Sequence, residues 1–235
     1  MPKGTLFLIP VPLADDSAER VLPASQGHLI NNIKTYIVEN EKTARRWLKE
    51  MGLQNPQSSL KIHVYGKHSE KDNLSHYFGE LESGEDVGLM SEAGCPAVAD
   101  PGSEIVAEAH RRGIKVVPMV GPSSILLALM ASGFNGQSFT FHGYLPIDKA
   151  QRAKKIRDLE LSSEKYRQTQ IFIETPFRNN QLLEEILRSC QGRTRLCVAC
   201  NVTGADEQII SLPVDQWRKL KPDFHKKPAI FLLLK

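Results

Sequence analysis

The stretch DVGLMSEAGCPAVADPG, residues 86–102, decides the fold class. Asp86–Met90 is a short apolar run that predicts a buried strand, and the segment Ser91–Gly102 is rich in glycine and proline. Ser103–Arg112 then shows apolar residues at helical spacing, and Lys115–Met119 is apolar again. This order predicts a parallel α/β sheet, with the Ser91–Gly102 loop at the edge formed by the carboxyl ends of the strands.

The same alternation continues towards the N-terminus, and a different pattern follows residue 120. Predicted strands of the first part are Thr5–Ile9, Thr35–Val38 and Lys61–Tyr65, and predicted helices are Glu41–Met51 and Asn73–Leu81. In the second part we expect helices at Ile125–Ser132, Lys149–Lys165 and Leu182–Ser189, and strands at Ser138–Tyr144, Gln170–Ile173, Arg195–Asn201, Glu207–Ser211 and Ala229–Leu234. We therefore predict an N-terminal α/β domain, residues 1–119, and a mixed α+β domain, residues 120–235.

The composition is that of an ordinary globular protein. The chain has 235 residues, of which 41% are hydrophobic and 24% charged, and a net charge of +3 permits an anionic partner without requiring one. The apolar run Thr5–Ile9 is too short for a secretory signal, and no run approaches the ~20 residues of a membrane helix. We expect a cytoplasmic protein with no membrane contact.

The four cysteines do not form the paired pattern of a zinc site. Cys197 and Cys200 make a single CxxC inside the apolar run 196–200, and a strand would point their thiols to opposite faces. We interpret them as reduced thiols in or beside a core and predict no metal site.

Two glycine-containing segments are the candidates for ligand binding. In Ser91–Gly102, Gly94 and Gly102 allow a ligand to approach the backbone, whose amides and carbonyls suit an amino acid or an adenosine. Gly121–Ser124 lies at a helix start, where amides and hydroxyls suit a carboxylate or a sugar. An ordinary connector and a helix cap are the alternatives. Because GxGxxG and Walker sequences are absent, an NAD or nucleotide enzyme is disfavoured.

Taken in order, four motifs give a resemblance to a known family: SEAGCPAVADPG (91–102), GPSS (121–124), FHGYLP (141–146) and ETPFR (174–178). They resemble S-D-A-G-T-P-x-x-x-D-P-G, P-G-P-S-A, F-x-G-F-L-P and E-S-P-H-R of the ribosomal RNA ribose methyltransferases in the tetrapyrrole methylase superfamily. The resemblance spans most of the chain, and four ordered motifs are far more specific than any one of them.

This resemblance implies a two-domain methyltransferase, usually a homodimer, that binds S-adenosylmethionine in a cleft between its domains and acts on small-subunit ribosomal RNA. The positions that it assigns to the cofactor are Leu13, Ser91, Ala93, Gly94, Ser123, Ser124, Thr175, Ala199, Asn201, Pro228 and Ala229.

The sequence also departs from the family pattern, which predicts a divergent member. Residues 13–17, LADDS, stand where the family has G-N-L-x-D, and residues 38–42, VENEK, stand for A-E-D-T-R. Residues 200–204, CNVTG, replace R-E-L-T-K. Single replacements are Glu92 for aspartate, Cys95 for threonine and Phe177 for histidine.

Methyl transfer to a ribose hydroxyl needs a base and a means of holding RNA. Glu39, Asp100 and Glu174 are the candidate bases, although each could be a solvated surface carboxylate, and His142 is as consistent with a core histidine. Arg178 and a basic helical cluster would hold RNA phosphates, unless the cluster is a solvated helix face. The cluster comprises Lys149, Arg152, Lys154, Lys155 and Arg157.

Two alternatives stay open. The acceptor could be a tetrapyrrole carbon or a protein side chain, within the same superfamily. The chain could also be an inactive interaction module that retains S-adenosylmethionine binding, for which the altered LADDS and VENEK segments are the best support.

Overall fold

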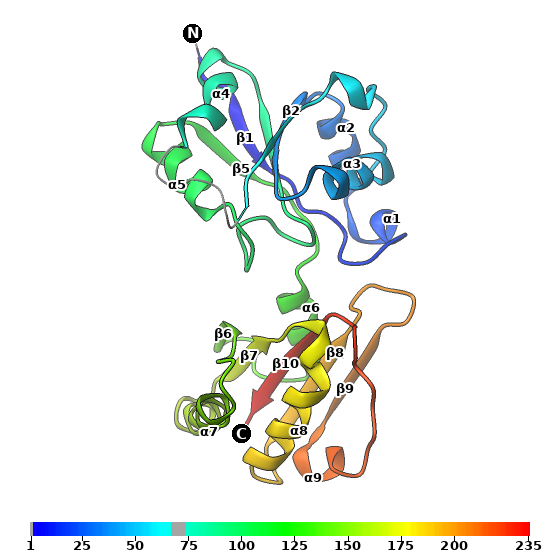
Figure 1. The fold of residues 1–235 in the computed structure, drawn as a ribbon, viewed down its shortest axis with the longest axis vertical. Coiled ribbons are helices and arrows are strands. Elements are labelled where there is room, and N and C mark those ends of the chain that lie inside the picture. The colour runs from blue at the N-terminus through cyan, green and yellow to red at the C-terminus, as the bar shows by residue number, and fades with distance from the viewer. Residues whose placement is uncertain (1, 67–73) are drawn as a thin grey trace. The chain divides into compact units, whose positions relative to one another are not determined.

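The computed structural model describes residues 2–66 and 74–235, which form two compact units, Met1–Ser123 and Ser124–Lys235. The boundary lies a few residues after the predicted one. Each unit is built around its own five-stranded sheet (Figure 1).

The first unit has a wholly parallel sheet in the order β3-β2-β4-β1-β5. Its strands are β1 Thr5–Leu8, β2 Thr35–Val38, β3 Lys61–Val64, β4 Val87–Met90 and β5 Lys115–Pro118. Its helices are α1 Ala18–Val21, α2 Ala24–Ile30, α3 Glu41–Glu50, α4 Gly79–Ser83 and α5 Ser103–Arg111, with 3-10 turns η1 Gln57–Ser59 and η2 Ser75–Tyr77. The predicted parallel α/β sheet is confirmed.

Helices cover both faces of this sheet, which is why its inner strands β2 and β4 are buried throughout. Successive side chains point to opposite faces, so Tyr36 and Val38 pack with α2 and α3, whereas Ile37 packs with α4 and α5. Loops, and not helices, cover the carboxyl ends of the strands.

One predicted helix of the first unit is wrong. Of the range Asn73–Leu81, Asn73 lies outside the described residues, and the remainder forms η2 and α4 in place of one helix. The break comes at Phe78, which is fully buried and separates η2 from α4. Packing of the phenylalanine ring into the core thus overrides the helical spacing.

The second unit has a mixed sheet in the order β6-β7-β10-β8-β9, in which only β6 and β7 pair in parallel. The strands are β6 Phe139–Tyr144, β7 Thr169–Ile173, β8 Arg195–Cys200, β9 Gln208–Pro213 and β10 Ala229–Leu234. The helices are α6 Ser124–Ser132, α7 Lys149–Tyr166, α8 Asn179–Ser189 and α9 Val214–Trp217, with the 3-10 turn η3 Pro176–Arg178. The prediction of a mixed second domain is confirmed.

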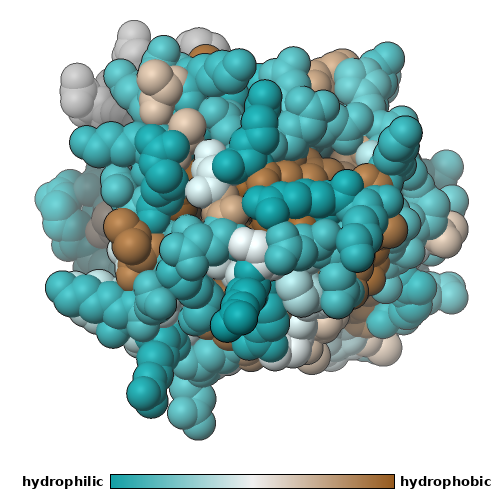
Figure 2. All heavy atoms as spheres, turned by 90° about the horizontal axis from the view of Figure 1, so that it is seen from below, coloured by the Kyte–Doolittle hydropathy of each residue, from teal (hydrophilic) through white to brown (hydrophobic). Residues whose placement is uncertain are grey.

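The core of the second unit lies between its sheet and helices α7, α8 and α9. Phe172 and Phe231 stack in parallel across β7 and β10, and Trp217 of α9 packs nearby. Cys197 and Cys200 are buried free thiols, as predicted. The face of the molecule shown in Figure 2 is mostly hydrophilic, with hydrophobic side chains gathered in small patches. Among residues 2–66 and 74–235, no helix is long and apolar enough to cross a bilayer.

Candidate functional site

In the first unit, the carboxyl ends of β2 and β4 bring two predicted site residues side by side. The last register pair of these parallel strands is Val38 with Met90. Glu39 and Ser91 directly follow that pair, so both lie at the carboxyl edge of the sheet, where open α/β sheets bind ligands. Glu39 is half-buried and Ser91 is 3% exposed, its hydroxyl donating to the Ala93 carbonyl at 3.2 Å.

The Ser91–Gly102 loop is fixed near its start by a two-way backbone contact. Val11 N–H donates to the Gly94 carbonyl at 3.0 Å, and Gly94 N–H donates to the Val11 carbonyl at 3.1 Å. Gly94 has φ +70°, and a Cβ there would come within 3.0 Å of Leu13 Cδ2 and 3.4 Å of the Pro122 carbonyl. Glycine is thus favoured where the three loops meet, because its φ is positive and a side chain there would press on Leu13.

The second glycine motif lies against the first loop as well. A Cβ on Gly121 would come within 2.2 Å of Pro10 Cβ, so this position admits glycine alone. The Cys95 thiol lies 3.4 Å from the Pro122 carbonyl and donates to it. The structure thereby brings Leu13, Ser91, Ala93 and Gly94 to one edge of the unit, which ends at the half-buried Ser123.

Helix α3 fixes these loops through residues that the sequence analysis did not select. Trp47 is 3% exposed, and its indole N–H donates to the Glu92 carbonyl at 2.9 Å. Thr43 donates its hydroxyl to the Glu92 carboxylate at 3.3 Å. Arg46 pairs with Asp15 in the loop after β1. The available signal was that a buried tryptophan usually finds an acceptor for its N–H.

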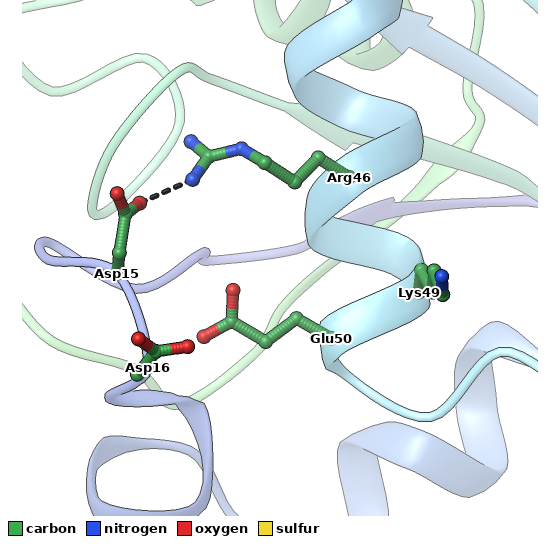
Figure 3. A pocket seen from close by; sticks show the side chains of 5 residues that line it. All are labelled: Asp15, Asp16, Arg46, Lys49 and Glu50. Atoms are coloured by element: carbon green, nitrogen blue, oxygen red, sulfur yellow. Dashed lines mark hydrogen bonds and ion pairs between the residues drawn. The ribbon is translucent and has the colours of Figure 1, made fainter.

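An open pocket of about 450 Å³ lies between α3 and the divergent LADDS segment (Figure 3). Its lining residues are Asp15, Asp16, Arg46, Lys49 and Glu50. Asp15 turns towards Arg46, and the carboxylates of Asp16 and Glu50 face each other. The glycine and asparagine of the family pattern are thus replaced by a charged segment that is tied to α3.

The second unit gathers its predicted cofactor residues at one end of its sheet. Register pairs Ile173 with Ile230 and Cys200 with Ala229, so the ends of β7 and β8 meet the start of β10. Asn201 N–H donates to the Pro228 carbonyl at 2.9 Å, and Thr175 follows β7 at the same edge. The structure thus brings Thr175, Asn201, Pro228 and Ala229 together.

Ala199 is placed differently from these residues. It lies inside β8, is fully buried, and pairs with Ile230 on one side and Ile209 on the other. From the predicted stretch 199–201, Asn201 is the residue that reaches the edge. It has φ +48°, and its side-chain amide donates to Asp206 at 2.8 Å.

Glu174 and Arg178 form an ion pair in the ETPFR motif, in which the carboxylate is buried and the guanidinium partly exposed. The Glu174 carboxylate accepts from Arg178 Nη2 at 2.6 Å and from Thr175 N–H at 2.6 Å. The Glu174 side chain is 1% exposed, whereas that of Arg178 is 31% exposed. Through these two hydrogen bonds Glu174 fixes the backbone just before η3 and the orientation of the Arg178 side chain. Among the predicted bases, Asp100 is half-buried in its loop.

Arg152 was predicted to belong to the RNA-binding basic cluster, and the structure contradicts this prediction. Its side chain is 9% exposed and pairs at 2.5 Å with Glu185, which is 5% exposed, so that it joins α7 to α8 inside the unit. A guanidinium held in this way is not available to RNA phosphates. Lys149 and Lys154 are exposed and Lys155 is half-buried, so the outward-facing cations of α7 remain.

His142 lies in β6 as a hydrogen-bonded histidine. Its Nε2 lies 2.7 Å from the Gln170 side-chain oxygen on β7. Burial lowers the pKa of His142, while the Gln170 hydrogen bond opposes that shift and nearby Lys155 adds to it. The imidazole is therefore neutral at pH 7. In the part of the chain that the structure describes, no group of three metal-ligating side chains occurs.

The predicted ligand of this edge of the first unit is an amino acid or an adenosine. Small residues, Ala93, Gly94 and Ala97, leave the backbone of the loop accessible. Between Cys95 and Gly102, the one backbone hydrogen bond within the loop joins Val98 N–H to the Cys95 carbonyl at 3.3 Å, as far as the described residues show.

Comparison with known proteins identifies the family. The model of the tetrapyrrole (corrin/porphyrin) methylases matches residues 24–217. A solved structure, the methyltransferase CobJ, has the same fold, with a TM-score of 0.66, 17% identity, and coverage of 99% of this chain and 94% of that one. The chain belongs to the tetrapyrrole methylase family. It is an S-adenosylmethionine-dependent methyltransferase, and the predicted cofactor is confirmed.

Two curated relatives are similar over nearly the whole chain. The ribosomal RNA small subunit methyltransferase I of Pseudomonas aeruginosa is 29% identical over 216 residues, which are 91% of this chain and 72% of that protein. The protein with the same description from Vibrio cholerae is 29% identical over 241 residues, covering 100% of this chain and 78% of that protein.

Proposed function

We propose that this methyltransferase acts on ribosomal RNA of the small subunit and methylates a ribose 2′-hydroxyl. The observation that carries the proposal is the near full-length similarity to small-subunit ribosomal RNA methyltransferases. The outward-facing cations of α7 and the partly exposed Arg178 support an RNA acceptor. Action on the ribosome implies a cytoplasmic protein.

Both units contribute to cofactor binding in this proposal. From the first come Leu13, Ser91, Ala93, Gly94 and Ser123, through backbone groups of loops that Val11, Gly121 and Trp47 hold in place. From the second come Ser124, Thr175, Asn201, Pro228 and Ala229, with Ala199 acting from inside β8. A homodimer is also part of the proposal, and light scattering tests it.

The bound S-adenosylmethionine supplies an activated methyl group on a sulfonium. The protein has to hold the ribose oxygen in line with the methyl carbon, and alignment of this kind is worth about 7–11 kcal/mol. As the oxygen–carbon bond forms, the carbon–sulfur bond breaks and the hydroxyl proton passes to a base. Glu39 is the favoured base because register places it beside Ser91, and Asp100 is second. Glu174 acts as a positioning residue for Arg178.

The test is methyl transfer from labelled S-adenosylmethionine to purified small ribosomal subunits. Methylation of a 2′-hydroxyl leaves the adjacent phosphodiester resistant to alkali, because that hydroxyl is the nucleophile of alkaline cleavage. We expect an alkali-resistant labelled dinucleotide with the wild-type chain, and loss of transfer with retained cofactor binding in Glu39→Gln. Asp100→Asn, which neutralises the second candidate base in the same way, is the variant with which Glu39→Gln is compared.

Other outcomes would favour the alternatives. Cofactor binding without transfer to subunits would favour the inactive interaction module, for which the altered LADDS segment tied to α3 is the structural support. Label in a protein or a tetrapyrrole, and not in RNA, would favour the second acceptor class. Absence of S-adenosylmethionine binding by folded protein would contradict the proposal at its first step.

A further inference from the structure

Phe177 is a large aromatic side chain exposed to solvent at the candidate edge of the second unit. It lies in η3 and is 64% exposed, whereas Phe172, Phe224 and Phe231 of the same unit are fully buried. Its ring meets that of His225 edge to face, with centroids 6.0 Å apart. A phenylalanine ring exposed to this extent presents an aromatic face on which a ligand can stack.

The two segments that carry this Phe177–His225 pair are tied together. Lys226 N–H donates to the Pro176 carbonyl at 3.0 Å. From α8, the Asn179 side chain donates to the Lys227 carbonyl at 2.6 Å, and Asn180 accepts from the Phe224 N–H at 2.9 Å. The Phe224 ring is fully buried in the core of the second unit and fixes the segment that carries His225. The pair is therefore pre-organised and loses little conformational entropy when a ligand stacks on it.

Most charged side chains near the pair have partners of their own. Lys227 lies 3.4 Å from Asp206, Arg178 pairs with Glu174, and Asp223 accepts from Asn180 and from the His225 N–H. For the exposed Lys226, no carboxylate lies within ion-pair distance among the described residues.

An exposed aromatic ring with a cation beside it is what proteins use to hold single-stranded RNA, because every base has a face that can stack. We propose that Phe177 is a stacking surface for an unpaired base of the RNA, with His225 at the edge of the ring and Lys226 contacting a flanking phosphate. A second copy of the chain is the other occupant that the test considers. Lys226 favours RNA, because a phosphate supplies the negative charge that the described residues do not place beside it. The inference rests on the proposed RNA acceptor.

The experiment measures binding of a labelled, unstructured oligoadenylate of about ten nucleotides by fluorescence anisotropy. Stacking of one base is worth roughly 1–3 kcal/mol, so Phe177→Ala should weaken binding by about 5- to 150-fold, and Phe177→Trp should restore it. Phe177→Ala should leave the salt dependence of binding unchanged. Lys226→Gln should reduce that slope by roughly 0.7 for one phosphate contact.

The matched control is Tyr166→Ala. Tyr166 is 59% exposed, has the Lys165 ammonium 5.0 Å from its ring centroid, and lies just before β7, whereas Phe177 lies after it. We expect this control to bind the oligonucleotide as the wild type does. Equal binding by wild type and Phe177→Ala, or equal weakening in the control, would overturn the proposal.

Two further measurements separate this proposal from the proposed function. S-adenosylmethionine affinity by calorimetry should be the same for wild type and Phe177→Ala, and a loss of cofactor binding in the variant would make Phe177 a cofactor residue. A change in mass by light scattering without a change in RNA binding would assign the ring to a protein contact. Failure of the wild type to bind the cofactor contradicts the proposed function and not the stacking surface.

Discussion

Trp47 lies outside the proposed cofactor site but donates a hydrogen bond to the Ser91–Gly102 loop, so a substitution of Trp47 should change cofactor binding indirectly. Trp47→Phe keeps an aromatic ring on the buried face of α3 but removes the indole N–H, which donates to the Glu92 carbonyl at 2.9 Å. The ring also lies under the Arg46 guanidinium, 4.1 Å from centroid to Cζ, and phenylalanine retains part of that contact. The substitution is therefore close to a removal of one hydrogen bond.

The magnitude follows from the value of such a bond. A buried hydrogen bond contributes about 0.5–1.5 kcal/mol net, which corresponds to a roughly 2- to 12-fold change in an equilibrium constant. Because the Glu92 carbonyl belongs to the proposed cofactor loop, we expect calorimetry to show S-adenosylmethionine binding weakened within that range. The circular dichroism spectrum should stay that of the wild type.

Trp217→Phe is the matched control. Trp217 is fully buried in the second unit, and its indole N–H donates to the Leu196 carbonyl at 2.8 Å, near the beginning of β8 and away from the edge formed by Asn201. Both variants should lower the free energy of unfolding, and only Trp47→Phe should lower cofactor affinity. Unchanged affinity in Trp47→Phe, or equal losses in both, would refute the idea that α3 positions the loop.

Three further predictions concern stability and pH. Arg152→Ala leaves the buried Glu185 carboxylate unpaired and should lower the free energy of unfolding in urea by about 3–5 kcal/mol. The exposed control Lys149→Ala should change it by less than about 0.5 kcal/mol. Equal effects of the two substitutions would contradict a buried Arg152–Glu185 pair. Gly121→Ala drives a Cβ against the Pro10 ring and should destabilise by about 1–3 kcal/mol with weaker cofactor binding; a melting temperature like the wild type's would exclude that crowding. Burial lowers the pKa of His142 in the folded protein, so the unfolded chain binds a proton there more readily. The contribution of His142 to stability is therefore complete above the unfolded pKa near 6.5 and is lost as the pH falls through the folded pKa. His142→Gln should flatten this loss in unfolding curves recorded between pH 7.5 and 5.5.

The predicted site residues were found in the sequence because backbone loops, and not side-chain clusters, define them. Glycines and prolines after buried strands specify where a chain turns at a sheet edge, and register then determines which loops are neighbours. Gly94 was predicted in this way, whereas Ser91 and Leu13 were assigned through the resemblance to the family. β2, β4 and β1 bring Glu39 and Leu13 next to Ser91 and Gly94. The roles of these residues in binding and catalysis remain predictions.

Side-chain partners were not predictable in the same way. Arg152 and Lys149 occur in one basic run, yet the helical rotation of α7 turns the first towards Glu185 and the second towards solvent. Glu185 lies 33 residues later in the chain, and no local pattern identifies it as the partner. Glu174 and Arg178 are only four residues apart, but the turn η3 decides that their side chains meet.

By itself, the sequence determined the alternation of strands and helices, the two-unit organisation and the membership of a methyltransferase family, because periodicity and turn residues act locally and motifs keep their order along the chain. The tertiary structure decided which charges are buried, that Trp47 supports the Ser91–Gly102 loop, and that Phe177 is exposed beside His225. Burial and pairing depend on residues distant in the chain, so their free energies are set only when the sheets and helices pack.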